Sequence, residues 1–170
     1  MEAEVLTKSD NTIQLKKKDI VKFKIVDEDG KETGEWLEFD LGDIELPFRW
    51  QEFGEQSKLN KANLRNKFLV INKKQDHKGK KLMSSNEEER FRAMKEFVEK
   101  QVKTYNLFLG ENGVQKLLCG RSLSWDTLEE INNIINDVIA PKLDLSFNNM
   151  MERIQEKYSN TTEKEENVLE

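Results

Sequence analysis

The sequence predicts an α+β fold that is predominantly helical. An N-terminal antiparallel sheet of two or three strands is followed by an assembly of four or five helices. Two observations support this prediction: apolar residues alternate with charged ones before residue 42, and they recur every three or four positions after it. At 170 residues, the chain has the length of one domain. We assign residues 1–158 to that domain, β-rich over 11–41 and helical over 43–158.

The strand prediction depends on period-two patterning. Val21, Phe23 and Ile25 alternate with lysines within the segment 19–27, and a second alternating run covers 35–41. An acidic turn that ends at Gly30 separates the two runs. The shorter run 12–16 could pair with the first strand, so the sequence leaves open whether the sheet has two strands or three.

The first helix is predicted to begin near Asp43, whose carboxylate can cap it, with Pro47 tolerated in the first turn. Gly54 is the position at which this helix could break. The apolar periodicity then continues to Ile71, and a polar, lysine-rich loop follows over residues 72–81.

The second helix has a predicted capping box between Ser85 and Glu88 and is expected to end at Gly110. Its apolar stripe steps by three and four residues. A short helix over 114–118 is predicted next. The stripe residues are Phe91, Met94, Val98, Val102 and Tyr105.

The last helical region is predicted to start at Ser124 or Asp126. Pro141 should end or kink it because proline offers no backbone N–H. A further helix is expected over 143–158, and the acidic segment 159–170 is expected to be a disordered tail.

The sequence offers no set of residues for catalysis, metal binding or cofactor binding. With one histidine and one cysteine, neither a disulfide framework nor a His/Cys metal site of the usual ligand number can form. The acidic turn 27–30 has its glycine at the wrong position for an EF-hand, and no P-loop ending occurs. We therefore expect a protein that is not an enzyme and has no cofactor.

Charge and hydropathy limit the partners and the compartment. The formal net charge of −5 argues against general nucleic-acid binding. The cluster Lys73–Lys81 is the one feature that favours such binding, but it carries neither an aromatic residue for stacking nor an arginine. The longest apolar run is Phe68–Ile71, and the N-terminus carries acids where a signal peptide would be basic. We expect a cytoplasmic protein without a membrane partner.

One stretch of the chain resembles a known family. Residues 105–131 pass from a helix end through the turn Phe108-Leu-Gly-Glu-Asn-Gly113 to a short helix and then to a capped helix that mixes apolar and acidic residues. This order resembles the tail assembly chaperones of long-tailed phages (siphoviruses) and prophages of Gram-positive bacteria, and the similarity covers roughly residues 35–158. The resemblance implies a non-enzymatic protein that binds the long, helical tape measure protein during virion morphogenesis. It also implies a location in the host bacterial cytoplasm and absence from the mature virion.

Six residues are candidates for protein–protein interaction, in a surface that would accept an amphipathic helix. The tape measure protein is the expected partner, with a tail tube protein or a second copy of the chain as other options. Packing in the protein core is the competing explanation for these apolar residues, and it applies above all to Leu117. A structural tail or head–tail connector component is the alternative function, followed by a nucleic-acid-binding regulator. The candidate residues are Trp36, Phe108, Leu109, Leu117, Leu118 and Trp125.

Overall fold

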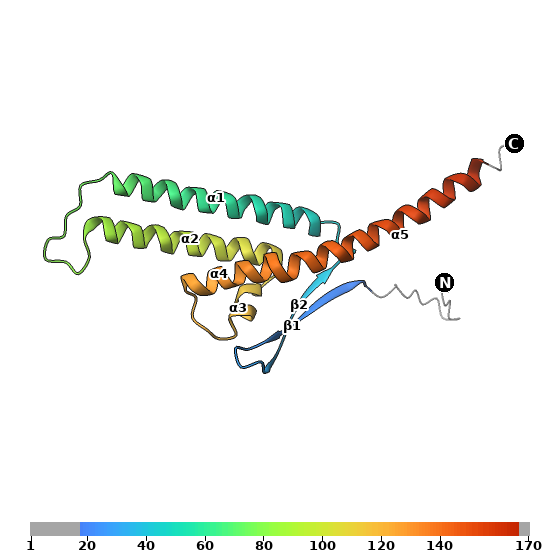
Figure 1. Cartoon of the computed structure of the whole chain (residues 1–170), viewed down its shortest axis with the longest axis horizontal. Coiled ribbons are helices and arrows are strands. Elements are labelled where there is room, and N and C mark those ends of the chain that lie inside the picture. The colour runs from blue at the N-terminus through green and yellow to red at the C-terminus, as the bar shows by residue number, and fades with distance from the viewer. Residues whose placement is uncertain (1–17, 167–170) are drawn as a thin grey trace, which may run out of the picture.

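The computed structural model describes the backbone of residues 18–166 and the side chains of residues 18–157. A two-stranded antiparallel ribbon precedes a long helical hairpin, a short helix and a final rod of helix (Figure 1). The prediction of a mostly helical α+β fold is confirmed. The possible third strand over 12–16 lies outside the described residues.

The ribbon consists of β1 (Ile20–Val26) and β2 (Glu32–Asp40), paired so that Phe23 faces Leu37 and the register slips between Lys24 and Val26. The Asp27 carboxylate closes the turn between the strands: its Oδ1 accepts hydrogen bonds from the backbone N–H groups of Asp29 (3.0 Å) and Lys31 (2.8 Å). Local hydrogen bonding therefore explains this acidic turn without a metal ion.

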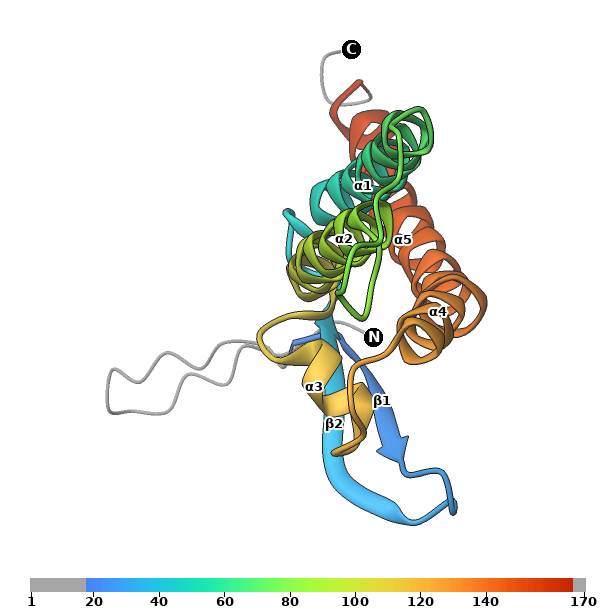
Figure 2. The same cartoon turned by 90° about the vertical axis from the view of Figure 1, so that its left-hand side faces the viewer.

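The helical hairpin consists of α1 (Leu46–Asn72) and α2 (Ser85–Leu109), which lie side by side in both cartoons (Figures 1 and 2). Gly54 does not break α1, since Phe53 and Ser57 on either side of it are buried against other elements. Asp43 is not the residue that caps α1. It lies two residues before the N-cap Glu45, where its carboxylate accepts from the Glu45 N–H (3.0 Å) and pairs with Arg49 (2.7 Å).

The capping box of α2 lies one residue earlier than the sequence predicted. Ser84 is the N-cap: its hydroxyl accepts from the Glu87 N–H (3.2 Å), and the Glu87 carboxylate accepts from the Ser84 N–H (2.7 Å). Ser85 instead forms hydrogen bonds with the α1–α2 loop. Its hydroxyl donates to the Asp76 carboxylate (3.3 Å) and accepts from the His77 N–H (3.2 Å). Two adjacent serines followed by three glutamates allow either register, and contacts with the loop select one.

The buried face of α2 follows the predicted stripe in part. Tyr105 is buried, and so is Phe97, which the sequence predicted to widen the stripe, but Phe91 is 58% exposed and the polar residue Gln101 is buried. The reason is that α1 and α2 meet partly through polar side chains. A hydropathy pattern places such polar residues at the surface. The helix face that it predicts to be buried is therefore turned away from the face that is buried in the structure.

The chain then forms α3 (Gly113–Leu118) and a continuous rod: α4 (Trp125–Asn133), a π-helical segment η1 (Ile134–Ile139) and α5 (Ala140–Glu166). Pro141 neither ends nor interrupts this rod. The wide turn just before it, in which the Ala140 N–H reaches the Ile135 carbonyl, accommodates a residue that has no N–H to donate. α5 runs past residue 158, where this helix was predicted to end, so the backbone of residues 159–166 is helical where disorder was expected; residues 167–170 lie outside the described residues.

The hydrophobic core lies where the ribbon, the base of the helical hairpin and the rod meet (Figure 1). Phe39, Phe53 and Phe108 pack together there, with the Phe108 ring 5.3 Å from that of Phe39 and 5.5 Å from that of Phe53. Ile131 and Ile135 add the rod's contribution. The tip of the helical hairpin and the end of α5 both project away from this core (Figure 1).

Candidate partner-binding surface

The described side chains, residues 18–157, form no cluster of metal ligands. No group of three or more His, Cys, Asp or Glu side chains there could hold a metal ion. Cys119 is partly buried just after α3, with its Sγ 3.4 Å from the Lys116 carbonyl oxygen, while His77 lies in the α1–α2 loop at the other end of the hairpin. The lone thiol and the lone imidazole are therefore not brought together.

The structure places three of the six candidate interaction residues in the core. Phe108, Leu109 and Leu118 are 3%, 4% and 8% exposed, and Leu117 is partly buried against the same core. Core packing is therefore the role of the first three in this structure. The sequence could not separate the two roles, since an apolar helix end looks the same whether a neighbouring element or a partner covers it.

Trp36 and Trp125 are the two candidates that reach solvent, 40% and 44% exposed. The Lys24 ammonium lies 5.8 Å from the centre of the Trp36 ring on the outer face of the ribbon. Trp125 begins α4 and packs its ring 5.6 Å from that of Phe97 on α2. They belong to separate parts of the fold, Trp36 on β2 and Trp125 at the start of α4.

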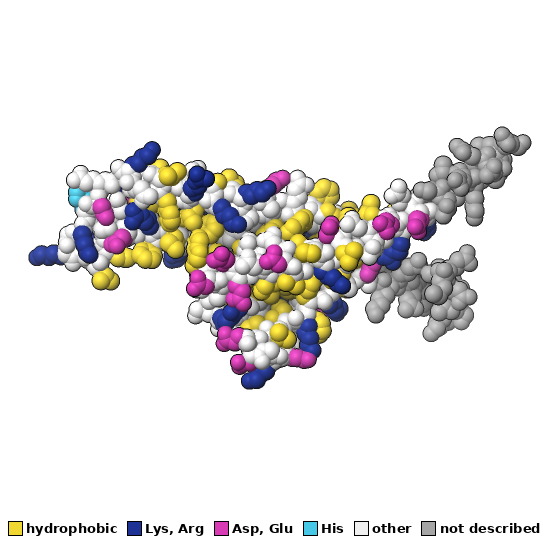
Figure 3. Space-filling model, viewed as in Figure 1, with side chains coloured by type: hydrophobic (Ala, Val, Ile, Leu, Met, Phe, Trp, Pro, Cys, Tyr) yellow, Lys and Arg dark blue, Asp and Glu magenta, His cyan; other side chains and the backbone are white. Residues whose placement is uncertain are grey.

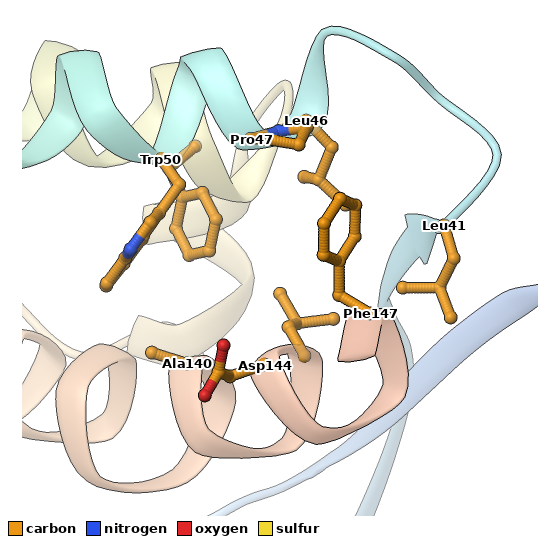
Figure 4. Close-up of a pocket in the computed structure, with 9 residues that line it drawn as sticks. Leu41, Leu46, Pro47, Trp50, Ala140, Asp144 and Phe147 are labelled. Carbon is orange, nitrogen blue, oxygen red and sulfur yellow. The ribbon is translucent and has the colours of Figure 1, made fainter. Parts of the chain in front are cut away.

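An apolar groove lies between the start of α1 and the start of α5, and we call it the α1–α5 groove (Figure 4). One wall carries Leu46, Pro47 and Trp50; the other carries Leu143 and Phe147 with Asp144 between them. Leu41 and Ala140 close its edges and Phe108 forms part of its floor. Its volume is about 220 Å³.

Trp50 gives this groove an aromatic wall. Its ring stacks on Phe53 at 5.2 Å and lies 4.8 Å from the ring of Phe108, yet the residue remains 37% exposed. Trp50 was not among the six residues predicted from the sequence. The spacing of Leu46, Trp50 and Phe53 by four and three residues was the available signal, but it does not show that α5 would lie opposite.

An apolar row leads from the groove along α5. Leu143, Phe147, Met150 and Ile154 are spaced by four, three and four residues, which places them on one face of a helix. Their exposure increases outward, from 8% at Leu143, through partial burial at Phe147 and Met150, to 42% at Ile154. The row thus begins in the core and continues beyond the elements that cover it.

Several charges near the groove form ion pairs, but the carboxylate that lines it does not. Asp40 pairs with Lys18 (3.0 Å), Asp43 with Arg49 (2.7 Å) and Asp19 with Arg153 on α5 (3.2 Å). The pKa of Asp40 is lowered by its hydrogen bond to Lys18 and by the N–H of Gly42. Asp144 has no ion pair with any residue in the described side-chain range 18–157 and faces the groove (Figure 4).

The lysine-rich loop is a weaker surface for nucleic acid than its composition suggests. Lys74 pairs with Glu89 (2.5 Å) and Lys81 with Glu88 (3.7 Å), both on α2. These glutamates offset part of the positive charge that would attract phosphates. Asp76 lies in the same loop, and its pKa is lowered by the N–H of Asn86 and by serine hydroxyls.

Figure 3 shows apolar side chains along the exposed helical hairpin and near the ribbon, interspersed with charges of both signs. Among the described helices, none is long and apolar enough to cross a bilayer. Comparison of the chain with protein-family models, curated proteins and solved structures gives no match. The assignment of function therefore depends on the surface itself and on the resemblance described above.

Proposed function

We propose that this protein is a non-enzymatic tail assembly chaperone of a long-tailed phage or prophage, which binds the helical tape measure protein before the tail tube assembles. One observation carries the proposal. The apolar row of α5 leaves the core at Leu143 and continues to Ile154 without a covering element among the described residues. An uncovered apolar helix face is a typical docking surface for another helix.

The rest of the chain agrees with a binding role. The row adjoins an apolar groove rather than a polar, catalytic one, and the helical rod carries it away from the body of the protein (Figure 1). A partner that is itself a long amphipathic helix could contact groove and row together. In this proposal the protein acts in the host cytoplasm and does not enter the virion.

The alternative function is a structural tail or head–tail connector component, which would assemble as a ring and stay in the particle. Such a component is expected to contain a larger sheet than the two-stranded one that the structure describes within residues 18–166. Nucleic-acid regulation is less favoured, because glutamates pair with two of the loop lysines.

The direct test is co-expression of the full chain with the tape measure protein from the same genome, followed by size-exclusion chromatography with light scattering. We expect several copies of the chain to co-elute with each tape measure protein and to keep it soluble. Mass spectrometry of purified virions should detect the tape measure protein and not this chain. A chain that runs alone, or that remains in virions, would contradict the proposal and favour the structural component.

A further inference from the structure

We propose that the α1–α5 groove and the α5 row together bind an amphipathic helix that places a basic residue next to its apolar anchor residues. The inference depends on the proposed function only for the identity of the partner. Three observations support the proposal: the size of the groove, its continuity with the α5 row, and the unpaired carboxylate of Asp144 in its lining.

The size of the groove favours a side chain over a small molecule. Pockets for drug-sized ligands typically measure about 300–1,000 Å³, and this groove holds about 220 Å³. That volume suits one large apolar side chain inserted against Trp50 and Phe147. A helix that docks through such an anchor would need further contacts outside the groove to bind stably.

The row supplies those contacts. Leu143 and Ile154 are eleven residues apart, so the row extends for about 17 Å, or three helical turns, at 1.5 Å per residue. A partner helix of three to four turns could place anchors at positions i, i+3 or i+4, and i+7 along it. Met151 is 47% exposed on one flank of the row and would widen the contact.

Asp144 determines the charge of the partner. It lies between Leu143 and Phe147, inside an otherwise apolar lining (Figure 4). A docking helix would remove water from this carboxylate, and an unpaired charge taken out of water is costly unless an opposite charge meets it. The neighbouring cations Lys18, Arg49 and Arg153 are already paired. Lys142, two positions before Asp144, lies on another side of the helix. The partner must therefore bring a lysine or arginine.

Trp50 provides a local probe for the test. In the full chain, Trp36→Phe and Trp125→Phe leave Trp50 as the single tryptophan. The probe is a synthetic 18-residue amphipathic helix with leucines at heptad spacing and lysines beside them; a matched peptide carries glutamates in place of those lysines. We expect the lysine peptide to shift Trp50 emission to the blue, and the glutamate peptide to bind about five- to tenfold more weakly.

Two variants of this reporter chain separate the groove from general electrostatics. Asp144→Lys and Asp137→Lys change the net charge equally and replace exposed aspartates in the same rod, but Asp137 does not line the groove. We expect Asp144→Lys to weaken the lysine peptide about five- to tenfold and to favour the glutamate peptide. Asp137→Lys should change neither by more than about twofold, since exposed charges at a distance are screened.

Several outcomes would overturn the inference. Equal binding of both peptides, or equal loss in both variants, would remove the role of Asp144. Trp50 shielded from iodide before any peptide is added would show that the groove is already occupied. Light scattering would then assign the occupant to a second copy if the mass doubles, or to residues 1–17 if it does not.

The proposed binding site and the proposed chaperone function can be refuted independently of each other. A chain that binds the lysine peptide but not the tape measure protein would retain the groove and refute the chaperone. If Asp144→Lys kept the tape measure protein soluble as well as the unmodified chain does, the chaperone would stand and the groove would not be its binding site.

Discussion

Asn60 on α1 donates hydrogen bonds through its Nδ2 to Gln101 Oε1 at 3.0 Å and to Thr104 Oγ1 at 3.1 Å on α2, inside the interface of the two long helices. Gln101 has no exposed surface and donates in turn to Ser57 Oγ at 2.7 Å. Four buried polar side chains thus satisfy one another. Because they pair in one register only, they fix how the helical hairpin aligns.

This network predicts a large cost for the loss of one member. Asn60→Ala should lower the free energy of unfolding by about 1–3 kcal/mol, because Gln101 Oε1 is then buried without a donor. Urea denaturation followed by circular dichroism measures the change. Asn63→Ala, at an exposed site on the same helix, is the matched control and should change stability by less than about 0.5 kcal/mol. Similar effects of both substitutions would contradict the network's role.

The N-cap of α2 can be assigned by experiment. Ser84→Ala removes the hydroxyl that accepts from the Glu87 N–H, so it should destabilise the protein by about 1 kcal/mol. Ser85→Ala removes contacts with an exposed loop and should cost about half as much or less. Thermal unfolding of the two variants under identical conditions makes the comparison, and a larger loss at Ser85 would favour the register expected from the sequence.

Two glycines should respond to alanine in opposite directions. Gly54 lies inside α1, and a Cβ there meets nothing within 4 Å, so Gly54→Ala should stabilise the protein by about 0.5–1 kcal/mol. Gly110 ends α2 at φ 91° and ψ 177°, a conformation that is essentially restricted to glycine. Gly110→Ala should therefore cost about 1–3 kcal/mol. Chemical denaturation of both variants tests the pair, and a shift of the same sign in each would refute this explanation.

Acid should weaken one surface cluster between the helices. Lys100 (2.7 Å) and Lys67 both bond to Glu96, which lowers the pKa of its carboxyl from the usual 4.5 to about 2. The stabilisation is therefore fully present above pH 4.5 and is lost as the pH falls through 2. A carbon-detected NMR titration of the Glu96 carboxyl should give a midpoint near 2.

A stability measurement provides the control for that titration. The difference in urea midpoint between the unmodified chain and Glu96→Gln should be present at pH 6 and shrink below pH 4.5. Glu99→Gln, whose partner Lys95 is 4.0 Å away at an exposed site, should show no comparable dependence. A Glu96 midpoint near 4.5 would show that the two lysines do not hold the carboxylate in solution.

The sequence by itself determined the elements that depend on local rules. Alternation placed both strands, glycine at 110 ended α2, and apolar spacing identified the helices on either side of Pro141. These features depend on interactions between residues a few positions apart, which a single sequence displays. The excess of apolar residues also led to the proposal of a binding role, although it could not place the surface.

The tertiary structure decided what depends on distant residues. The α1–α2 interface turned Gln101 and Thr104 inward and Phe91 outward, against their hydropathy. The π-helical turn kept the rod continuous past Pro141, so that Leu143 enters the core and Ile154 lies outside it. Phe108 and Leu109 became core residues, whereas Trp50 and Asp144, 94 positions apart in the chain, came to share one groove. Such contacts form only when the chain folds, since no local pattern records which helix a given face will meet.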